Sequence, residues 1–467
     1  MIEFILNNEL IKTEVPTGSI LLDFIRTNKQ LSGTKIGCRE GDCGACTVLL
    51  GAVNSVGSVD YKSIVSCLTP IANVQGKHVV TIEGLNLKEG LTSVQDAIKN
   101  NNATQCGFCT PGFVVSLTGY AFNKNTSIEG VKDAISGNIC RCTGYKSIEK
   151  ATEDIEGILV DKDDSDTTKW LIDNKFIPEY FTEIPARLAK IQSKSVCNSN
   201  GIIVGGGTDI YVTQADKFQE LEIDIISEKK DSSNITIANN TCTIGAASTV
   251  SDILNVSELH NYFPELNEFF KLISSKQIRN MGTLGGNLVN ASPIADLSIF
   301  FIALNSKINI TDNKENNRTI FLKDFFKGYK SVDLSDGEII RELTFSLPDK
   351  TQYFNFEKVS KRAHLDIASV NSAMSITIKN NIINDIYISA GGVSPIPLFL
   401  KNTCLFLRGK ELSSENIRKA DCVLKEEISP ISDVRGSKKY KQQLLSQLYY
   451  NHFIKLFPSV INISDIK

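Results

Sequence analysis

The sequence predicts a multidomain α+β protein, and three observations support this prediction. Its 467 residues are enough for roughly three domains of ~100–200 residues each. Of its 12 cysteines, most fall into two compact groups, at 38–67 and 106–142. Residues 2–6 alternate between apolar and polar as a strand does, whereas apolar side chains in 94–155 recur at helical spacing.

Composition and charge exclude several functional classes. The hydrophobic fraction of 42% supports ordinary cores, and a net charge of −3 without any basic run argues against a nucleic-acid surface. The first residues have neither the basic segment nor the apolar segment of a secretory signal. No stretch approaches the ~20 apolar residues that span a membrane. We therefore expect a cytoplasmic protein that binds neither nucleic acid nor membrane.

The first cysteine group follows two predicted strands, a turn at 7–8 and a short helix near 21–25. Its members are Cys38, Cys43, Cys46 and Cys67. The spacing C-x4-C-x2-C…C is that of plant-type ferredoxins, which bind a 2Fe–2S cluster. Gly37, Gly41 and Gly44 would let the backbone curl around a cluster and direct N–H groups at its sulfurs. A zinc knuckle with a glycine-rich turn is the alternative.

The second group lies between helical segments predicted at 94–99, 113–122, 128–135 and 148–155, which would form a small four-helix arrangement. Its members are Cys106, Cys109, Cys140 and Cys142. Thr110 is expected to cap a helix and Gly137 to end one. The spacing alone leaves zinc and iron–sulfur ligation equally open. Disulfides are disfavoured in a reducing compartment. The isolated cysteines are predicted to be small buried residues: Cys197, Cys242, Cys404 and Cys422.

Two glycine-rich segments follow a polar stretch at 157–169 that reads as an interdomain linker. The first comes directly after a strand at 202–204 and contains three consecutive glycines, 205–207. Such a turn exposes N–H donors that can approach a pyrophosphate, although most triple glycines are only turns. It is not the dinucleotide pattern G-x-G-x-x-G. The second segment, 279–296, follows a helix predicted at 265–275.

The last region is predicted to contain a β-hairpin and two helices. Strands at 375–378 and 382–388 flank the turn residues Asn380 and Asn381. Helices are expected at 415–425 and 438–457. The second places Tyr440, Leu444, Leu448 and His452 on one stripe, which is predicted to be core rather than a binding surface.

Together these motifs resemble the molybdenum hydroxylases, the xanthine dehydrogenase/aldehyde oxidase family. Residues 105–113 and 137–145 resemble its helical iron–sulfur domain, and the two glycine-rich segments resemble its FAD-binding domain. The resemblance covers the whole chain. It implies a β-grasp, plant-type ferredoxin-like 2Fe–2S domain at 1–78, a four-helix 2Fe–2S domain at 79–156, a linker at 157–172, a two-part α+β FAD-binding domain at 173–348 and a C-terminal α/β flavoprotein subdomain at 352–467.

The resemblance also implies two 2Fe–2S clusters, bound by the eight grouped cysteines, and one FAD. Asp209 stands where many relatives carry a different polar residue, but we still expect FAD to bind. Tyr329 would lie beside the flavin ring, although a packed core aromatic fits the sequence equally well. The expected FAD contacts are Ile203, Val204, Gly205, Gly206, Gly207, Thr208, Asp209, Ile210, Thr283, Leu284, Gly285, Gly286, Asn287, Asp296, Tyr329, Ile340 and Lys358.

The function implied is that of an electron-transfer subunit, most closely of xanthine dehydrogenase. Molybdopterin would reside on a large partner subunit in a hetero-oligomer, and electrons would pass through both clusters to FAD and then to NAD⁺. No side chain of this chain is expected to act as acid or base. One alternative is the small subunit of a hydroxylase for aldehydes or N-heterocycles. Another is a redox sensor without turnover.

Overall fold

The computed structural model describes residues 1–124, 126–191, 201–228, 232–362, 365–462 and 464. They divide into two compact units, Met1–Glu228 with Ser275–Gly282, and Lys229–Ser274 with Thr283–Lys467. The predicted α+β class is confirmed. Within the described ranges, no helix combines the length and the apolar character needed to cross a membrane.

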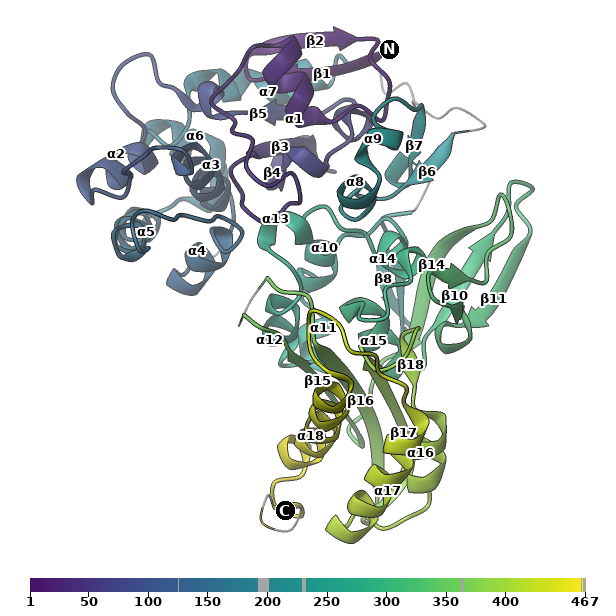
Figure 1. The fold of residues 1–467 in the computed structure, drawn as a ribbon. Helices are drawn as coiled ribbons and strands as arrows, with labels where there is room; N and C mark the ends of the chain where they lie inside the picture. Colours follow the sequence, from purple (N-terminus) through teal and green to yellow (C-terminus); the bar gives the residue numbers. More distant parts are fainter. Residues whose placement is uncertain (125, 192–200, 229–231, 363–364, 463, 465–467) are drawn as a thin grey trace. The chain divides into compact units, whose positions relative to one another are not determined.

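The first unit opens with a five-stranded sheet in the order β2-β1-β5-β3-β4 (Figure 1). Its strands are β1 Ile2–Leu6, β2 Glu9–Thr13, β3 Thr47–Val53, β4 Val59–Val65 and β5 His78–Val80. Strand β1 pairs parallel with β5, and the other pairs are antiparallel. The predicted turn is confirmed, with Asn7 at a φ of 53°. The predicted short helix is α1 (Leu21–Asp23), continued by the π-helical turn η1 (Phe24–Asn28).

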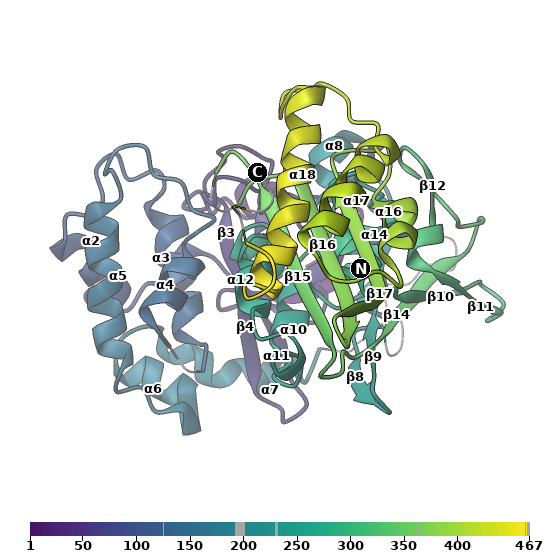
Figure 2. The ribbon, with the colours of Figure 1, turned by 90° about the horizontal axis from the view of Figure 1, so that it is seen from below.

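Four helices follow as predicted, and they pack on one another (Figure 2). They are α2 Ser93–Asn100, α3 Thr110–Ala121, α4 Ile128–Ala134 and α5 Lys146–Leu159. Helix α3 begins three residues before the predicted segment 113–122, and Cys109 rather than the predicted Thr110 occupies the cap position. Gly137 is not the predicted helix cap. Helix α4 ends at Ala134, and a Cβ at Gly137 would overlap the Gln277 side chain, so Gly137 permits close packing instead.

The rest of the first unit includes the stretch predicted as a linker. Helix α6 (Thr167–Asp173) lies there, and its Leu171 is buried in the core of the helical domain. The predicted strand at 202–204 is confirmed as β6 (Ile202–Val204), which pairs parallel with β7 (Ile223–Ile225). The remaining helices and turns are α7 Ile184–Leu188, α8 Ile210–Thr213, α9 Ala215–Phe218, α13 Lys276–Arg279, η2 Ser66–Leu68, η3 Ile71–Val74, η4 Ile82–Leu85, η5 Asp164–Asp166, η6 Glu179–Glu183 and η7 Ile226–Glu228.

The second unit contains an antiparallel sheet in the order β11-β10-β14-β9-β8. The helix predicted at 265–275 is shorter, because α12 ends at Lys271 and Ser274 adopts a left-handed φ of 52°. The strands are β8 Ile235–Ala238, β9 Thr241–Gly245, β10 Lys307–Thr311, β11 Asn317–Phe321 and β14 Ile339–Ser346, with a small pair, β12 Phe326–Gly328 and β13 Ser331–Val332. The helices and turn are α10 Val250–Leu254, α11 Leu259–Tyr262, α12 Leu266–Lys271, α14 Leu284–Asn290, α15 Asp296–Ala303 and η8 Leu322–Asp324.

The C-terminal part of this unit is a second sheet, β15-β16-β17-β18, packed against helices (Figure 2). Its elements are β15 Gln352–Val359, β16 Val370–Lys379, β17 Ile382–Gly391, β18 Leu398–Phe399, α16 Lys401–Leu407, α17 Ser414–Glu427 and α18 Lys438–Leu456. The predicted hairpin and both helices are confirmed. Every strand pair is antiparallel because hairpins or short loops join neighbouring strands, so this part is α+β rather than α/β.

Helix α18 covers β15 and β16 through its predicted apolar stripe. Leu444, Leu448 and His452 are buried, whereas Tyr440 at the start of the helix is exposed. Along β17, alternate residues serve opposite faces. Ile386 and Ile388 belong to the core shared with α16–α18, while the Ser389 hydroxyl donates to the Ile299 carbonyl of α15.

The fully buried His452 has a fixed partner at each ring nitrogen. The Asn355 amide donates to Nδ1 over 2.8 Å, and Nε2 lies 3.0 Å from the Ser372 hydroxyl, which donates to the Ser389 carbonyl. The ring is therefore neutral with its proton on Nε2. Burial, together with nearby Lys455, lowers the pKa of His452 to about 3.

This burial should make the second unit sensitive to acid. The unfolded histidine takes up its proton near pH ~6.5, whereas the folded one stays neutral down to about pH 3. The contribution of His452 to the free energy of unfolding is therefore fully present above pH ~6.5 and is lost as the pH falls toward 3. The loss amounts to roughly 2 kcal/mol at about pH 5. His452→Gln should remove this component, and urea unfolding at neutral and mildly acid pH measures it. An unchanged pH dependence in the variant would contradict the assignment.

Candidate functional site

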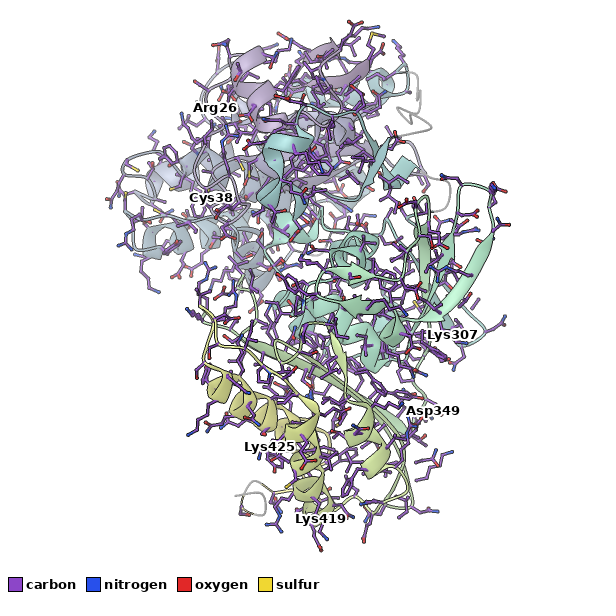
Figure 3. The ribbon with its side chains drawn as sticks, turned by 45° about the vertical axis from the view of Figure 1, so that its right-hand side comes forward. Arg26, Cys38, Lys307, Asp349, Lys419 and Lys425 are labelled. Carbon is purple, nitrogen blue, oxygen red and sulfur yellow. The ribbon has the colours of Figure 1, made fainter. Side chains whose placement is uncertain are left out.

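The first four cysteines are gathered by the loop before β3 and by the pairing of β3 with β4. Thr47 of β3 and Val65 of β4 are partners in that ladder. Cys46 precedes Thr47, and Cys67 lies in η2 just after Val65, so the pairing brings these two cysteines together. Cys38, on the loop itself, is labelled in Figure 3. Its N–H donates to the Cys43 sulfur over 3.4 Å. The thiols thus form two pairs, Cys38 with Cys43 and Cys46 with Cys67.

In each of these two pairs, the pKa of one thiol is lowered and that of the other is raised. The hydrogen bond from Cys43 lowers the pKa of Cys38 to about 5 and raises that of Cys43. The bond between Cys46 and Cys67 likewise lowers the pKa of Cys46 and raises that of Cys67. The Glu40 N–H also donates to the Cys38 sulfur, over 3.3 Å. In each pair, the thiolate of one cysteine is therefore stabilised, and the thiolate is the form that binds soft metals.

The second group is positioned by the start of α3 and by the turn before α5. Cys142 and Cys106 form one pair, with their sulfurs 3.5 Å apart. Cys109 and Cys140 form the other, through a side-chain hydrogen bond. Burial raises the pKa of Cys109 to about 12, whereas a bond from the Phe108 N–H lowers that of the exposed Cys106.

The arrangement of the cysteines in pairs can be compared with the ligand sets of a zinc ion and of a 2Fe–2S cluster. Across the described ranges, no three His, Cys, Asp or Glu side chains converge where one metal ion could be held. A structural zinc needs four ligands around a single ion. A 2Fe–2S cluster instead divides its four ligands between two irons. Two thiol pairs in each domain match the two-by-two division of ligands in a 2Fe–2S cluster.

The two cysteine loops pack directly on each other. The Ile139 N–H donates to the Cys43 carbonyl over 2.9 Å, and the Asn138 amide donates to the Gly44 carbonyl over 3.1 Å. A Cβ on Gly44 would overlap the carbonyl of Gly137. Backbone thus lies against backbone between the two groups.

The segment Ser275–Gly282 contacts both loops. The Gln277 amide donates to Asn138 Oδ1 and to the Ser116 hydroxyl, each over 3.0 Å. The buried Arg279 reaches both carboxylate oxygens of Asp133, at 2.7 and 2.6 Å. Sequence reasoning missed these residues, because their partners lie 139 and 146 positions away and no local pattern marks them.

The first glycine-rich turn also lies against this segment. A Cβ on Gly206 would overlap the Met281 carbonyl, and Gly207 adopts a left-handed φ of +81°. In the described chain, the N–H groups of residues 206–209 have no protein acceptor. They remain available to an anion such as a pyrophosphate. The turn belongs to the first compact unit, together with Ile203, Val204 and Ile210.

The second glycine-rich segment, Thr283–Asn287, belongs to the second unit. Unlike those of the first turn, the N–H groups of its residues 284–287 have protein acceptors. The N–H groups of Leu284 and Gly285 donate to the Ser248 and Ala246 carbonyls, and Thr283 caps α14 by accepting from Gly286. Asn287 donates within the helix. Protein acceptors therefore take the N–H groups of Leu284, Gly285, Gly286 and Asn287, and contact between this segment and FAD stays a prediction.

The other expected FAD contacts also lie in the second unit. Asp296 and Lys358 form an ion pair at 2.7 Å. The Asn371 amide also donates to the Asp296 carboxylate, and the Lys358 ammonium also donates to the Leu272 carbonyl. Ile340 is buried in β14. Tyr329 is 70% exposed between β12 and β13, which excludes the core-aromatic alternative and leaves its ring free to stack.

The isolated cysteines give a mixed outcome. Cys242 and Cys404 are buried as predicted. Cys422 is exposed on α17, so the prediction is wrong there, because that face of the helix points to solvent. Cys197 lies outside the described residues.

Four family models match the chain in succession. They are a 2Fe-2S iron-sulfur cluster binding domain at 4–71, a 2Fe-2S binding domain at 81–153, an FAD binding domain in molybdopterin dehydrogenase at 178–348 and a CO dehydrogenase flavoprotein C-terminal domain at 355–456. The chain therefore contains two 2Fe–2S domains and an FAD-binding domain.

Curated relatives match nearly the whole chain. Xanthine dehydrogenase of Emericella nidulans is 29% identical over 88% of this chain, and xanthine dehydrogenase 1 of Arabidopsis thaliana is 27% identical over 95%. Aldehyde oxidase 1 of Rattus norvegicus is 26% identical over 97%. The chain spans 35%, 38% and 39% of these relatives.

Solved structures support the fold of part of the chain. Carbon monoxide dehydrogenase from Hydrogenophaga pseudoflava matches 54% of this chain and 88% of its own, with a TM-score of 0.51 at 23% identity. Quinoline 2-oxidoreductase from Pseudomonas putida matches 55% and 90%, with a TM-score of 0.50 at 21% identity.

The close packing at Gly206 yields a test of the first glycine-rich turn. Gly206→Ala should lower the FAD content of the purified protein severalfold, because its Cβ would force the turn away from Met281. Gly157→Ala is the matched control, since a Cβ there meets nothing within 4 Å. Flavin absorbance after gel filtration measures occupancy. Full FAD occupancy in the Gly206→Ala variant would contradict the assignment of this turn to the FAD site.

Proposed function

The chain belongs to the molybdenum hydroxylase family, of which it carries the iron–sulfur and FAD-binding domains, and we propose that it is the electron-transfer subunit of a xanthine dehydrogenase. A molybdopterin-binding large subunit would oxidise the substrate. When bound, the clusters would carry one electron at a time, and FAD would collect two electrons and pass them to NAD⁺ as a hydride. The chain's own residues hold these groups and take no acid or base role.

The hydrogen bond from Ile139 to Cys43 is the observation that carries this proposal. It joins the residue beside Cys140 directly to a cysteine of the other domain. Asn138 and Gln277 are both buried here, where the Asn138 amide donates to the Gly44 carbonyl and the Gln277 amide donates to Asn138 Oδ1. Two sulfur sets at such short range suit transfer between clusters rather than two independent sensors.

The xanthine and NAD⁺ assignments rest on relatives. Xanthine dehydrogenases from a plant and a fungus align with nearly all of this chain. Aldehyde oxidases align equally far, which supports the alternative of a hydroxylase for aldehydes or N-heterocycles. The partner's substrate pocket decides between them, so the substrate must be tested on the complex.

Cys106→Ser tests the proposed path in the complex with the molybdopterin-binding partner. Cys106 is exposed and pairs only with Cys142 among the described thiols, so the exchange disturbs little packing. The wild-type chain should contain four irons, two per cluster. The variant should lose xanthine:NAD⁺ turnover and keep NADH:dye activity close to wild type, because the flavin domain is untouched.

Cys422→Ser is the control, since Cys422 is exposed and belongs to neither group. FAD content and partner association should persist in both variants. Xanthine:NAD⁺ turnover that survives after the helical cluster is shown to be missing would contradict the path. A wild-type complex that oxidises an aldehyde or an N-heterocycle but not xanthine would replace the proposed substrate with the alternative.

A further inference from the structure

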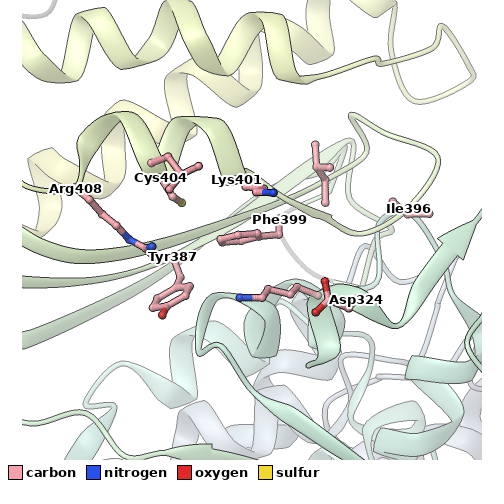
Figure 4. A pocket seen from close by; sticks show the side chains of 10 residues that line it. Asp324, Tyr387, Ile396, Phe399, Lys401, Cys404 and Arg408 are labelled. Carbon is pink, nitrogen blue, oxygen red and sulfur yellow. The ribbon is translucent and has the colours of Figure 1, made fainter. Parts of the chain in front are cut away.

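A cavity of about 440 Å³ lies in the second unit, beside the edge strand β18, helix α16 and the turn η8 (Figure 4). This volume falls in the range of ~300–1,000 Å³ that is typical of small-molecule sites. None of its lining residues is among the expected FAD contacts. It is therefore a separate feature of this unit.

Two aromatic rings form one wall of the cavity. Tyr387 of β17 and Phe399 of β18 have ring centroids 6.0 Å apart and planes inclined by 33°. Figure 4 shows both rings between α16 and the segment that carries Asp324. The Arg408 guanidinium lies over Tyr387, 5.1 Å from the ring centroid. The Lys323 ammonium also lies over Tyr387, 5.5 Å from the ring centroid. Both rings are half-buried, and their exposed parts give the cavity an aromatic surface flanked by cations.

The lining carries an excess of positive charge. Arg408 is paired with Asp385 at 2.7 Å. The Lys323 ammonium donates to the neutral Asn305 amide oxygen and sits 5.0 Å from the Phe399 centroid, without a carboxylate partner in the described chain. Lys401 is exposed and likewise has no ion-pair partner among described residues. Among the described lining residues, Asp324 is the single carboxylate.

The remaining wall argues against a catalytic or metal site. Cys404 is buried, and its sulfur accepts the Ile388 N–H over 3.2 Å. Burial raises the pKa of Cys404 to about 12, so the thiol stays protonated and behaves as an apolar surface. Flat rings, apolar walls and uncompensated lysines together suit a ligand that is aromatic, planar and negatively charged.

We propose that this cavity binds a small planar aromatic anion of the nucleoside monophosphate class. The base stacks against Tyr387 and Phe399, and the anionic group approaches Lys323 and Lys401. Ring and charge are both needed, because the rings alone would accept any apolar molecule and the lysines alone any anion. This site does not depend on the function proposed above.

Isothermal titration of the full, FAD-saturated chain with adenosine monophosphate tests the proposal. Saturation with FAD prevents the probe from entering the flavin's own adenosine site. Adenosine and inorganic phosphate, which lack the charge and the ring respectively, should bind at least about tenfold more weakly. Lys401→Ala should weaken the monophosphate by about three- to tenfold and leave adenosine unchanged.

Phe399→Leu should weaken both the monophosphate and adenosine, because it removes the ring and keeps an apolar side chain. Lys419→Ala, on α17 and paired with Glu415, is the control and should change neither (Figure 3). No binding of the monophosphate at about 5 mM would overturn the proposal. So would binding that is unchanged in both Lys401→Ala and Phe399→Leu, or binding that disappears only as FAD is added.

Discussion

Backbone packing between the two cysteine loops is the constraint on which the cofactor sites depend. Gly44, at a left-handed φ of +66°, lies against the Gly137 carbonyl, and a Cβ on Gly112 would overlap the Gly44 carbonyl. Any side chain at these positions would push the loops apart. The Gly44 carbonyl accepts from the Thr47 hydroxyl and N–H of its own domain and from the Asn138 amide of the other loop. The Asn138 bond and the Ile139–Cys43 bond join the two loops into one structural unit.

The segment Ser275–Gly282 packs on the same part of the first compact unit. It belongs to the first compact unit although the residues before and after it belong to the second. Gln277 and Arg279 are buried, and the helical domain accepts from the Gln277 amide N–H groups and pairs Asp133 with the Arg279 guanidinium, while Gln277 Oε1 has no partner in the described chain. Burying them without partners would be strongly unfavourable. Met281, at the other end, supports Gly206 of the first glycine-rich turn. The order of that turn therefore depends on folded iron–sulfur domains.

Local patterns predicted what depends on local chemistry. Cysteine spacing indicated both sulfur sites, and periodicity located the four helices and the hairpin at Asn380–Asn381. Long-range contacts account for the errors. Glycine is the residue type expected at a helix cap, but Gly137 is instead required because the Gln277 side chain packs closely against it. The acceptors of the Leu284 and Gly285 N–H groups, the Ser248 and Ala246 carbonyls, also come from distant residues. No rule based on neighbouring residues could have supplied those partners, nor the buried network around Arg279.

Magnetic coupling between the two reduced clusters tests the packing of the cysteine loops most directly. EPR of the fully reduced chain should show two interacting 2Fe–2S signals in the wild type. Asn138→Ala, which removes the amide between Gly44 and Gln277, should keep the iron content and weaken the coupling. Asn101→Ala, at the end of α2, should leave it unchanged. Two fully formed but magnetically isolated clusters in the wild type, or the same coupling in Asn138→Ala, would contradict this account.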